Sequence, residues 1–316
     1  MRRTVKHIFK TRSVVTDIAE PEKLFGNHWL PYAQAEKIVF NEGTMLIQYF
    51  SHFLFFLELT KIELYSDLEA GFYNEKTRLF LFMMLKGNVS FFTKEGQPII
   101  VAETDTCYAT YNRNGEFKYK LLKGSHEFLY ICPRTAWMGR NEEYYPRIGQ
   151  FIHNMKTDRK LFGHMSTCTM NEDLQGSIKQ FFSLKNSGQL DFEFSILRIV
   201  KSIINHYQSL LETKFSQRAY VIKDYLEEHF AELIDNKILA THFFTTEKTL
   251  IKSFRKEFGI TPYNYLISIR MERAKNLLQY EKLSPIQVYS KVGYSDFQSF
   301  RKQFKNYFGM PPSSYH

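Results

Sequence analysis

Two kinds of hydrophobic pattern divide the chain. Between residues 35 and 135, short apolar and aromatic runs are cut by turn signals, as expected for β-strands. From residue 171 onward, apolar residues recur every three or four positions, which is the period of amphipathic helices. The change of period predicts an α+β protein with a β-rich N-terminal part and a helical C-terminal part.

The strands of the first part are marked by the turns between them. Lys-Gly-Asn at 86–88, Lys-Glu-Gly-Gln at 94–97 and Asn-Arg-Asn-Gly at 112–115 are typical turn sequences. The runs that we predict as strands are 78–85, 89–93, 98–102, 107–111, 117–122 and 127–132. Short strands at such regular spacing predict a sandwich or a barrel.

Two amphipathic helices are predicted after the strands, over residues 172–184 and 192–211. In the second, apolar residues follow a 3, 4, 3, 4 spacing, which is the seam of a two-heptad coiled coil. The seam residues are Leu197, Val200, Ile204, Tyr207 and Leu211. The seam predicts a dimer contact, but an ordinary helix packed on its own domain would show the same spacing. The polar stretch 212–217 (ETKFSQ) is predicted to be a linker.

These patterns predict three regions. Residues 1–165 form a β-rich domain, residues 166–213 a helical segment for dimerisation, and residues 214–316 an all-helical domain. In the last region, residues that begin helices recur: Ser216, Asn236, Thr245 or Thr246, Thr261 before Pro262, Ser284 before Pro285, and Ser295 or Asp296. Glycines at 259, 293 and 309 mark helix ends.

An internal repeat lies within the helical domain. The segment FRKEFGITPYNY at 254–265 matches FKNYFGMPPSSY at 304–315. Each copy has an apolar stripe of residues spaced by four: Leu250, Phe254 and Phe258 in the first, Phe300, Phe304 and Phe308 in the second. Basic and polar residues occupy the other face. The repeat predicts two helix-turn-helix motifs joined by a long helix over 262–279, each suited to a DNA major groove.

The charge is concentrated in the same domain. The chain of 316 residues has a net charge of +9. From residue 214 onward there are 16 Lys and Arg against 10 Asp and Glu, a net charge of +6. A basic domain indicates a polyanionic partner.

The sequence lacks the residues that other classes of function require. No His-x-His pair occurs, and His126-Glu127 is the only neighbouring His–acid pair of the β-rich region, so neither a metal nor a cofactor is expected and the chain is not expected to be an enzyme. Cys107, Cys132 and Cys168 show no CxxC spacing and supply no zinc-bound cysteine cluster. Short apolar runs and the absence of a signal-like segment predict a cytoplasmic protein that does not span a membrane.

The helical domain resembles a known family. Residues from about 218 to 316 resemble the DNA-binding domain of AraC/XylS transcription regulators, most specifically in Val292, Gly293, Tyr294, Ser295, Asp296, Phe300, Phe304, Lys305, Phe308, Gly309, Pro312 and Tyr315. The β-rich part, around LFMMLKGNVSFF at 81–92, more loosely resembles the cupin-like jelly roll that precedes this domain in many members. A cupin-type enzyme or ligand-binding protein with an appended DNA-binding domain is the alternative.

The resemblance implies a function and partners. It implies a sequence-specific regulator that binds double-stranded DNA through two recognition helices within 246–258 and 296–308, contacts RNA polymerase, forms a homodimer, and responds to a small effector at its N-terminal domain. Base contacts are expected from Lys248, Ile251, Lys252, Gln298, Ser299 and Lys302. Phosphate contacts are expected from Thr246, Arg255, Lys256, Ser295, Arg301 and Lys305.

Some residues depart from the family pattern. Phe244 and Thr245 stand in the first turn where the family has a small and an apolar residue, and Tyr289 stands where it has Ala. Ile251 cannot hydrogen-bond to a base, although it can touch a thymine methyl group. In the N-terminal domain, Phe82, Phe91, Tyr108, Tyr111 and Trp137 either line an effector cavity or fill the core.

Overall fold

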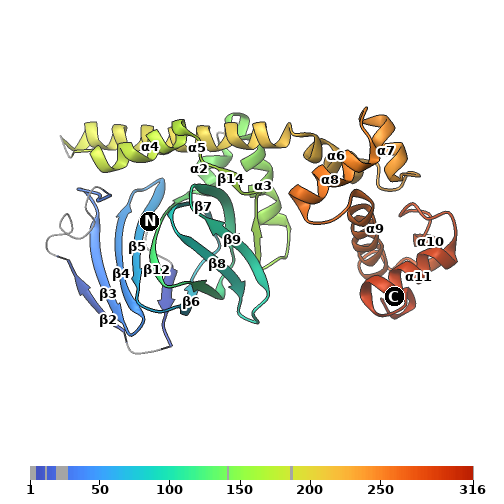
Figure 1. The fold of residues 1–316 in the computed structure, drawn as a ribbon, viewed down its shortest axis with the longest axis horizontal. Helices are drawn as coiled ribbons and strands as arrows, with labels where there is room; N and C mark the ends of the chain where they lie inside the picture. The colour runs from blue at the N-terminus through green and yellow to red at the C-terminus, as the bar shows by residue number, and fades with distance from the viewer. Residues whose placement is uncertain (1–4, 11–12, 19–27, 141, 186–187, 316) are drawn as a thin grey trace. The chain divides into compact units, whose positions relative to one another are not determined.

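The computed structural model describes residues 5–10, 13–18, 28–140, 142–185 and 188–315. The chain divides into two compact units, Met1–Glu212 and Thr213–His316, here called the N-terminal and C-terminal units. The helical segment 166–213 therefore groups, up to residue 212, with the β-rich part. Figure 1 shows strands and covering helices in the N-terminal unit and helices throughout the C-terminal unit.

Two antiparallel sheets form the N-terminal unit. In the described residues, one sheet has the strand order β1 (Val5–Ile8), β6 (Leu68–Asn74), β11 (Gly115–Leu121), β8 (Asn88–Thr93) and β9 (Pro98–Glu103). The other has the order β13 (Phe162–His164), β10 (Thr106–Asn112), β7 (Arg78–Lys86), β12 (Gly124–Pro133), β5 (Phe55–Leu64), β4 (Gly43–Ser51), β3 (Gln34–Phe40) and β2 (Val14–Asp17), with β14 (Cys168–Thr169) also beside β10. The six strands predicted between residues 78 and 132 are confirmed within three residues at each end.

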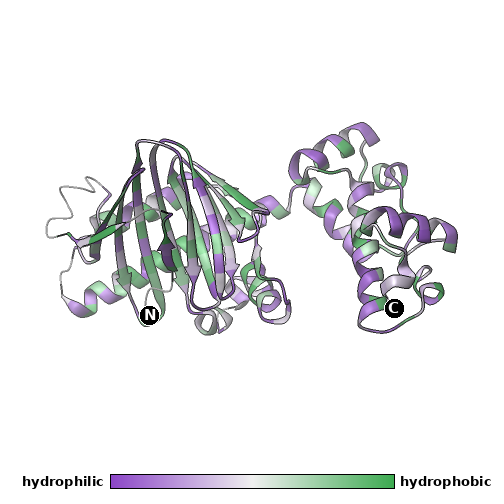
Figure 2. Cartoon of the chain, turned by 90° about the horizontal axis from the view of Figure 1, so that it is seen from below, coloured by the Kyte–Doolittle hydropathy of each residue, from purple (hydrophilic) through white to green (hydrophobic). Residues whose placement is uncertain are grey.

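The two sheets enclose a common apolar core. Side chains of one core cluster come from both sheets, including Phe72 and Phe117 from the first and Phe56, Phe82 and Tyr130 from the second. Alternation along the strands sends every second residue into this core, and Figure 2 shows hydrophobic and hydrophilic residues alternating along them. The sandwich or barrel expected from the sequence is therefore present.

Helices cover the outer face of the larger sheet. They are α2 (Thr135–Gly139), the short η1 (Glu142–Tyr144), α3 (Pro146–Thr157), α4 (Glu172–Ser183) and α5 (Gln189–Phe215). Figure 1 shows α4 and α5 side by side, and the hydroxyl oxygens of Ser177 and Ser202 lie 2.9 Å apart between them. The sequence pattern did not predict α2 and α3.

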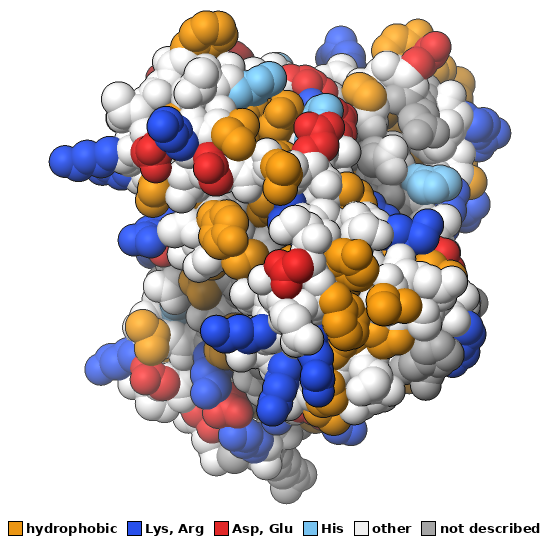
Figure 3. Space-filling model, turned by 90° about the vertical axis from the view of Figure 1, so that its right-hand side faces the viewer, with side chains coloured by type: hydrophobic (Ala, Val, Ile, Leu, Met, Phe, Trp, Pro, Cys, Tyr) orange, Lys and Arg blue, Asp and Glu red, His pale blue; other side chains and the backbone are white. Residues whose placement is uncertain are grey.

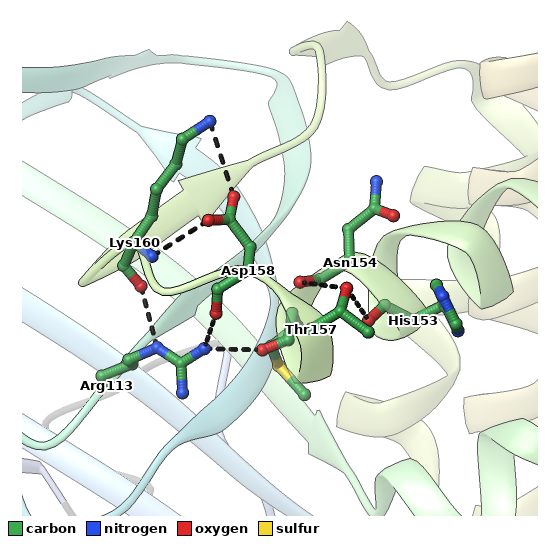
Figure 4. A network of polar contacts seen from close by, with 7 residues as sticks. Arg113, His153, Asn154, Thr157, Asp158 and Lys160 are labelled. Carbon is green, nitrogen blue, oxygen red and sulfur yellow. Dashed lines mark hydrogen bonds and ion pairs between the residues drawn. The ribbon is translucent and has the colours of Figure 1, made fainter. Parts of the chain in front are cut away.

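A polar network holds the end of α3 against the strands (Figure 4). Arg113, which directly follows β10, donates from Nε to the carbonyl oxygen of Lys160 at 2.8 Å and from Nη2 to that of Met155 at 2.9 Å. The same Nη2 also contacts the carbonyl oxygen of Asp158. One guanidinium thus satisfies carbonyl groups at and beyond the end of the helix, where no intrahelical partner is available.

The seam predicted for dimerisation is used inside the unit. Val200, Ile204, Tyr207 and Leu211 are buried within the chain, and Leu197 is half-buried. Ile204 and Tyr207 face Leu79 and Leu81 of β7. This burial favours the alternative of an ordinary helix packed on its own domain, and the dimer contact of the seam stays a prediction.

The C-terminal unit contains α6 (Arg218–Glu228), α7 (Asn236–His242), α8 (Glu247–Phe258), α9 (Pro262–Gln279), α10 (Pro285–Val288), α11 (Phe297–Phe308) and the short η2 (Pro312–Tyr315).

The predicted linker is wrong in part, because α5 continues to Phe215. The predicted cap at Ser216 is also wrong, since α6 begins after Gln217. Asp235 rather than Asn236 caps α7, accepting from the Ile238 amide at 2.7 Å. In the described part of the chain, no helix is long and apolar enough to cross a membrane.

Truncating the packed face of α5 is expected to destabilise the N-terminal unit. Ile204→Ala removes a side chain that is fully covered by the sheet, which costs about 2–5 kcal/mol of the free energy of unfolding. Trp29 and Trp137 both lie in this unit, so urea unfolding followed by tryptophan fluorescence reports on it. The matched control is Leu190→Ala on the same helix, where the side chain is exposed and the change should stay within about 0.5 kcal/mol. Equal losses in the two variants would contradict the packing described here.

Candidate nucleic-acid interface

Each helix-turn-helix copy has a core of its own. The first core joins Ile222 of α6 and Leu239 of α7 with Leu250 and Phe254 of α8. The second joins Val288 and Val292 with Phe300 and Phe304 of α11. The joining helix α9 serves both, because Leu266 belongs to the first core, and Met271, Ala274 and Leu278 belong to the second. The internal repeat of the sequence is therefore a repeat of structure.

The two predicted recognition helices begin and end in the same way. Thr246 caps α8 by accepting from the Thr249 amide at 3.2 Å, and Asp296 caps α11 by accepting from the Ser299 amide at 2.8 Å. The hydrogen bond from that amide lowers the pKa of the Asp296 carboxyl group. Gly259 and Gly309 end the helices in the left-handed conformation, with φ of 76° and 77°. Ser295 lies before the cap and is exposed.

Nearly all the predicted DNA-contacting residues lie on the solvent side. All of them are exposed except Ile251, which is half-buried against the first core. On α8 the exposed cations are Lys248, Lys252, Arg255 and Lys256, opposite the buried stripe of Leu250 and Phe254. On α11, Gln298, Arg301, Lys302 and Lys305 lie opposite Phe300 and Phe304 in the same way.

These cations differ from other basic residues of the unit in their contacts. Within the described residues, none of the seven Lys and Arg on α8 and α11 named above takes part in an ion pair. By contrast, Lys223 pairs with Glu227 at 2.8 Å, and Arg273 and Lys275 lie over the rings of Phe230 and Phe308. Lys and Arg side chains project at several places in the face shown in Figure 3. The two helices therefore offer positive charge that an external anion can neutralise.

The first turn, where Phe244 departs from the family pattern, has an unusual backbone conformation. Phe244 adopts a left-handed conformation with φ of 49°, and its side chain is 94% exposed. The Phe244 amide bonds to the carbonyl oxygen of Thr241, as that of Gly293 bonds to Ser290 in the second copy. The two residues thus take the same place in their turns, and only the second copy has the glycine that this conformation favours. Tyr289 is half-buried, with its ring 6.0 Å from that of Phe297.

Arg270, which the sequence analysis missed, connects the two copies. It lies on α9, is only 7% exposed, and donates to the carbonyl oxygens of Phe230 at 2.8 Å and Glu232 at 2.7 Å. Those carbonyl groups belong to the loop between α6 and α7 of the first copy. Its guanidinium also lies 5.4 Å from the ring centroid of Tyr294, in the second copy. A charged residue between Leu266 and Ala274 in the apolar stripe of α9 was the signal that could have revealed it.

A close backbone contact supports the same junction. Gly293 has a φ of 81°, and a Cβ atom added to it would lie 2.9 Å from backbone atoms of Ala231. The turn of the second copy therefore rests directly on the loop of the first. Only glycine allows both the conformation and the approach.

A second network that the sequence analysis missed joins the end of α5 to α8. Lys214 Nζ lies 2.8 Å from Glu257 Oε1, and the hydroxyl group of Tyr220 donates to the same oxygen at 2.6 Å. Burial acts to raise the pKa of the Glu257 carboxyl group, but the hydrogen bonds from Lys214 and Tyr220 lower it overall. Glu257 thus remains an anion, and its contacts hold α8 to Lys214 and Tyr220.

Comparison with known proteins identifies the family. A model described as "Helix-turn-helix domain" matches residues 239–316. The HTH-type transcriptional activator RhaS of Escherichia coli is 30% identical over 227 residues, which cover 69% of this chain and 77% of that protein. The chain belongs to the AraC/XylS family of transcription regulators. The Msm operon regulatory protein of Streptococcus mutans, 30% identical over 124 residues, is matched over 38% of this chain and 45% of its own length.

A solved structure aligns with most of this AraC/XylS chain. ToxT from Vibrio cholerae is 13% identical and covers 84% of this chain and 97% of its own, with a TM-score of 0.36.

Substituting Gly293 is expected to loosen the junction between the two copies. Gly293→Ala and Gly309→Ala impose the same left-handed strain, but only the first also creates a clash, since nothing lies within 4 Å of a Cβ at Gly309. We expect Gly293→Ala to lower the stability of α9 and α11 by about 1–3 kcal/mol more than Gly309→Ala. Amide hydrogen exchange of peptides from these helices, read by mass spectrometry, measures the difference. Matching exchange in the two variants would argue against the close contact.

Proposed function

We propose that this protein is a sequence-specific DNA-binding transcription regulator whose helices α8 and α11 read successive major grooves on one face of the duplex. The observation that carries the proposal is the repeated arrangement of a buried aromatic stripe and an exposed face whose cations have no described ion pair. Membership of the AraC/XylS family supports it.

The two helices read bases by different chemistry in this proposal. On α11, Gln298 and Ser299 supply hydrogen-bonding groups at the helix N-terminus and Lys302 supplies a cation one turn later. On α8, Lys248 and Lys252 take these roles, while the half-buried Ile251 offers only apolar contact. Gln pairs well with adenine and Lys with guanine, so the second copy discriminates more base types.

Phosphate contacts hold the helices in place. Arg255, Lys256, Arg301 and Lys305 are exposed beside the base-reading positions, and Thr246 and Ser295 lie at the starts of the two helices. Amide groups at a helix N-terminus attract phosphate oxygens. The proposal includes a cytoplasmic homodimer that contacts RNA polymerase and a small effector bound by the N-terminal unit, as the family resemblance implies.

Loss of a base contact should change sequence preference. Gln298→Ala and Lys302→Ala are each expected to reduce discrimination at one base position by about 1–3 kcal/mol, because a directional contact is lost. A sequence selected by the full-length protein from random DNA, and its single-base variants, provide the binding assay. The control is Lys237→Ala, an exposed cation on α7. If the wild-type protein selects no sequence, the regulator proposal fails.

Loss of a phosphate contact should have a different signature. Arg301→Ala or Lys305→Ala is expected to weaken binding to all sequences alike and to make the slope of log affinity against log salt shallower by about one. Titration of the same DNA at several salt concentrations measures the slope. A changed base preference at an unchanged slope would reassign these residues to base reading.

A further inference from the structure

The junction between the two helix-turn-helix copies joins a loop to a receiving surface. The loop, residues 229–235 between α6 and α7, is here called the first loop. The receiving surface belongs to the second copy: Arg270 donates to two carbonyl oxygens of the first loop, and Gly293 lies against the backbone of Ala231. The internal repeat therefore predicts a receiving surface on the first copy and a second loop on the second copy, and a chain with two copies has no third one to join them.

Arg218 has the same position on α6 as Arg270 has on α9. In both helices, buried side chains follow the arginine one, four and eight residues later, on the face that packs into the core. They are Ala219, Ile222 and Leu226 on α6, and Met271, Ala274 and Leu278 on α9. The two arginines differ in burial, because Arg270 is only 7% exposed at the junction whereas Arg218 is exposed. The first copy thus presents to solvent the guanidinium that the second copy uses to hold a loop.

Phe244 completes the receiving surface of the first copy. It takes the place in its turn that Gly293 takes in the second copy, as their equivalent backbone hydrogen bonds show. A Cβ atom at Gly293 would lie 2.9 Å from the backbone of Ala231 in the first loop. By the repeat, the Phe244 side chain therefore projects toward the place where a loop of another copy would lie. The ring is 94% exposed and is held by a left-handed backbone that Phe rarely adopts.

The second loop, residues 280–284 between α9 and α10, is the counterpart of the first. The two loops end at the cap positions of their helices, Asp235 before α7 and Ser284 before α10. Four residues before each cap, Tyr280 corresponds to Ala231. Tyr280 is 69% exposed, and Glu281 beside it is also exposed. The second loop thus offers a ring and a carboxylate, which match the ring and the guanidinium of the receiving surface formed by Phe244 and Arg218.

We propose that the second loop of one chain binds the receiving surface of a second copy of this chain on a neighbouring DNA site, so that their C-terminal units join head to tail. Tyr280 of one chain packs on Phe244 of the next, since aromatic rings attract each other at close range. Glu281 pairs with Arg218 of the next chain. The contact joins two different surfaces, so it can repeat along a duplex. This inference rests on the proposed function and names a partner for it.

The contact sets the spacing and the orientation of neighbouring sites. In the proposed function, α8 and α11 read successive major grooves, which lie about 10.5 base pairs apart. A head-to-tail partner continues this series, so its site lies two helical turns, or about 21 base pairs, further along in the same orientation. A dimer contact elsewhere in the chain would depend on neither Arg218 nor Glu281.

The spacing is tested with the full-length protein and DNA that carries its selected sequence once or twice. With two sites in the same orientation about 21 base pairs apart, occupancy of the first should strengthen binding at the second at least about fivefold. Inserting about five base pairs, half a helical turn, or reversing one site should lower this cooperativity to less than about twofold. Equal cooperativity on all three DNAs, or none on any, overturns the inference. A protein that selects no sequence defeats the regulator proposal instead.

The ion pair is tested by exchanging its charges. Arg218→Glu and Glu281→Arg should each lower the cooperativity on the in-phase sites to less than about twofold, because like charges then meet, while affinity for a single site stays within about twofold of the wild type. The double variant again offers opposite charges and should recover the cooperativity. The matched control Lys237→Glu makes the same change of charge on α7 and should keep it. A double variant that recovers nothing overturns the pairing, and equal losses on single and paired sites would place Arg218 on the DNA.

The aromatic contact is tested by a variant that cannot act through misfolding of the turn. Phe244→Gly removes the ring and supplies the residue that a left-handed turn favours, so amide hydrogen exchange of α7 and α8 should be no faster than in the wild type. Its cooperativity on the in-phase sites should nevertheless fall, as should that of Tyr280→Ala. The control Leu233→Ala removes an exposed apolar side chain from the first loop, which is already occupied within the chain, and should leave cooperativity unchanged. Wild-type cooperativity in Phe244→Gly overturns the inference.

Discussion

Arg270 is a charged side chain enclosed where the two helix-turn-helix copies meet, and its burial is tolerated because backbone carbonyl groups accept from its guanidinium. Burial still lowers its pKa from the usual value, which reflects the free energy needed to hold a cation out of water. The carbonyl partners come from the first copy and the aromatic partner Tyr294 from the second. The spacing between α8 and α11 thus depends on one residue whose loss would leave buried acceptors unsatisfied.

The basic residues of the C-terminal unit fall into two groups with different roles. Arg270, Arg273 and Lys214 contact rings, carbonyl groups or a carboxylate and hold helices together. Those on α8 and α11 have exposed side chains without described ion pairs. Net charge alone cannot separate these groups, because a cation used in packing counts the same as one available to DNA. Their position relative to the buried stripes separates them.

The parts of the fold that were predictable are those where local pattern and tertiary packing agree. The strands from 78 to 132 are short apolar and aromatic runs separated by Gly and Asn turns, and the caps at Thr246 and Thr261 follow from single residues. Helix α5 continues through the polar stretch to Phe215 because Lys214 forms an ion pair with Glu257, which lies more than forty residues later in the chain. A pattern read over a few neighbouring residues cannot reveal such a contact. The seam on α5 left two interpretations open for a related reason: the spacing shows which face of the helix is apolar but not which surface covers that face.

The two helices that we propose to read bases occur in a fixed order along the chain and differ in chemistry. In the proposed mode of binding, α8 offers Lys248, Ile251 and Lys252 to the bases, whereas α11 offers Gln298, Ser299 and Lys302. Exchanging the two sets would change which functional groups meet which bases. A C-terminal unit built in this way has a direction along the DNA. Its binding sequence is not the same when read in the two directions along a duplex, so a bound unit is oriented toward one end of the DNA. The start of transcription can then lie on a defined side of the bound unit.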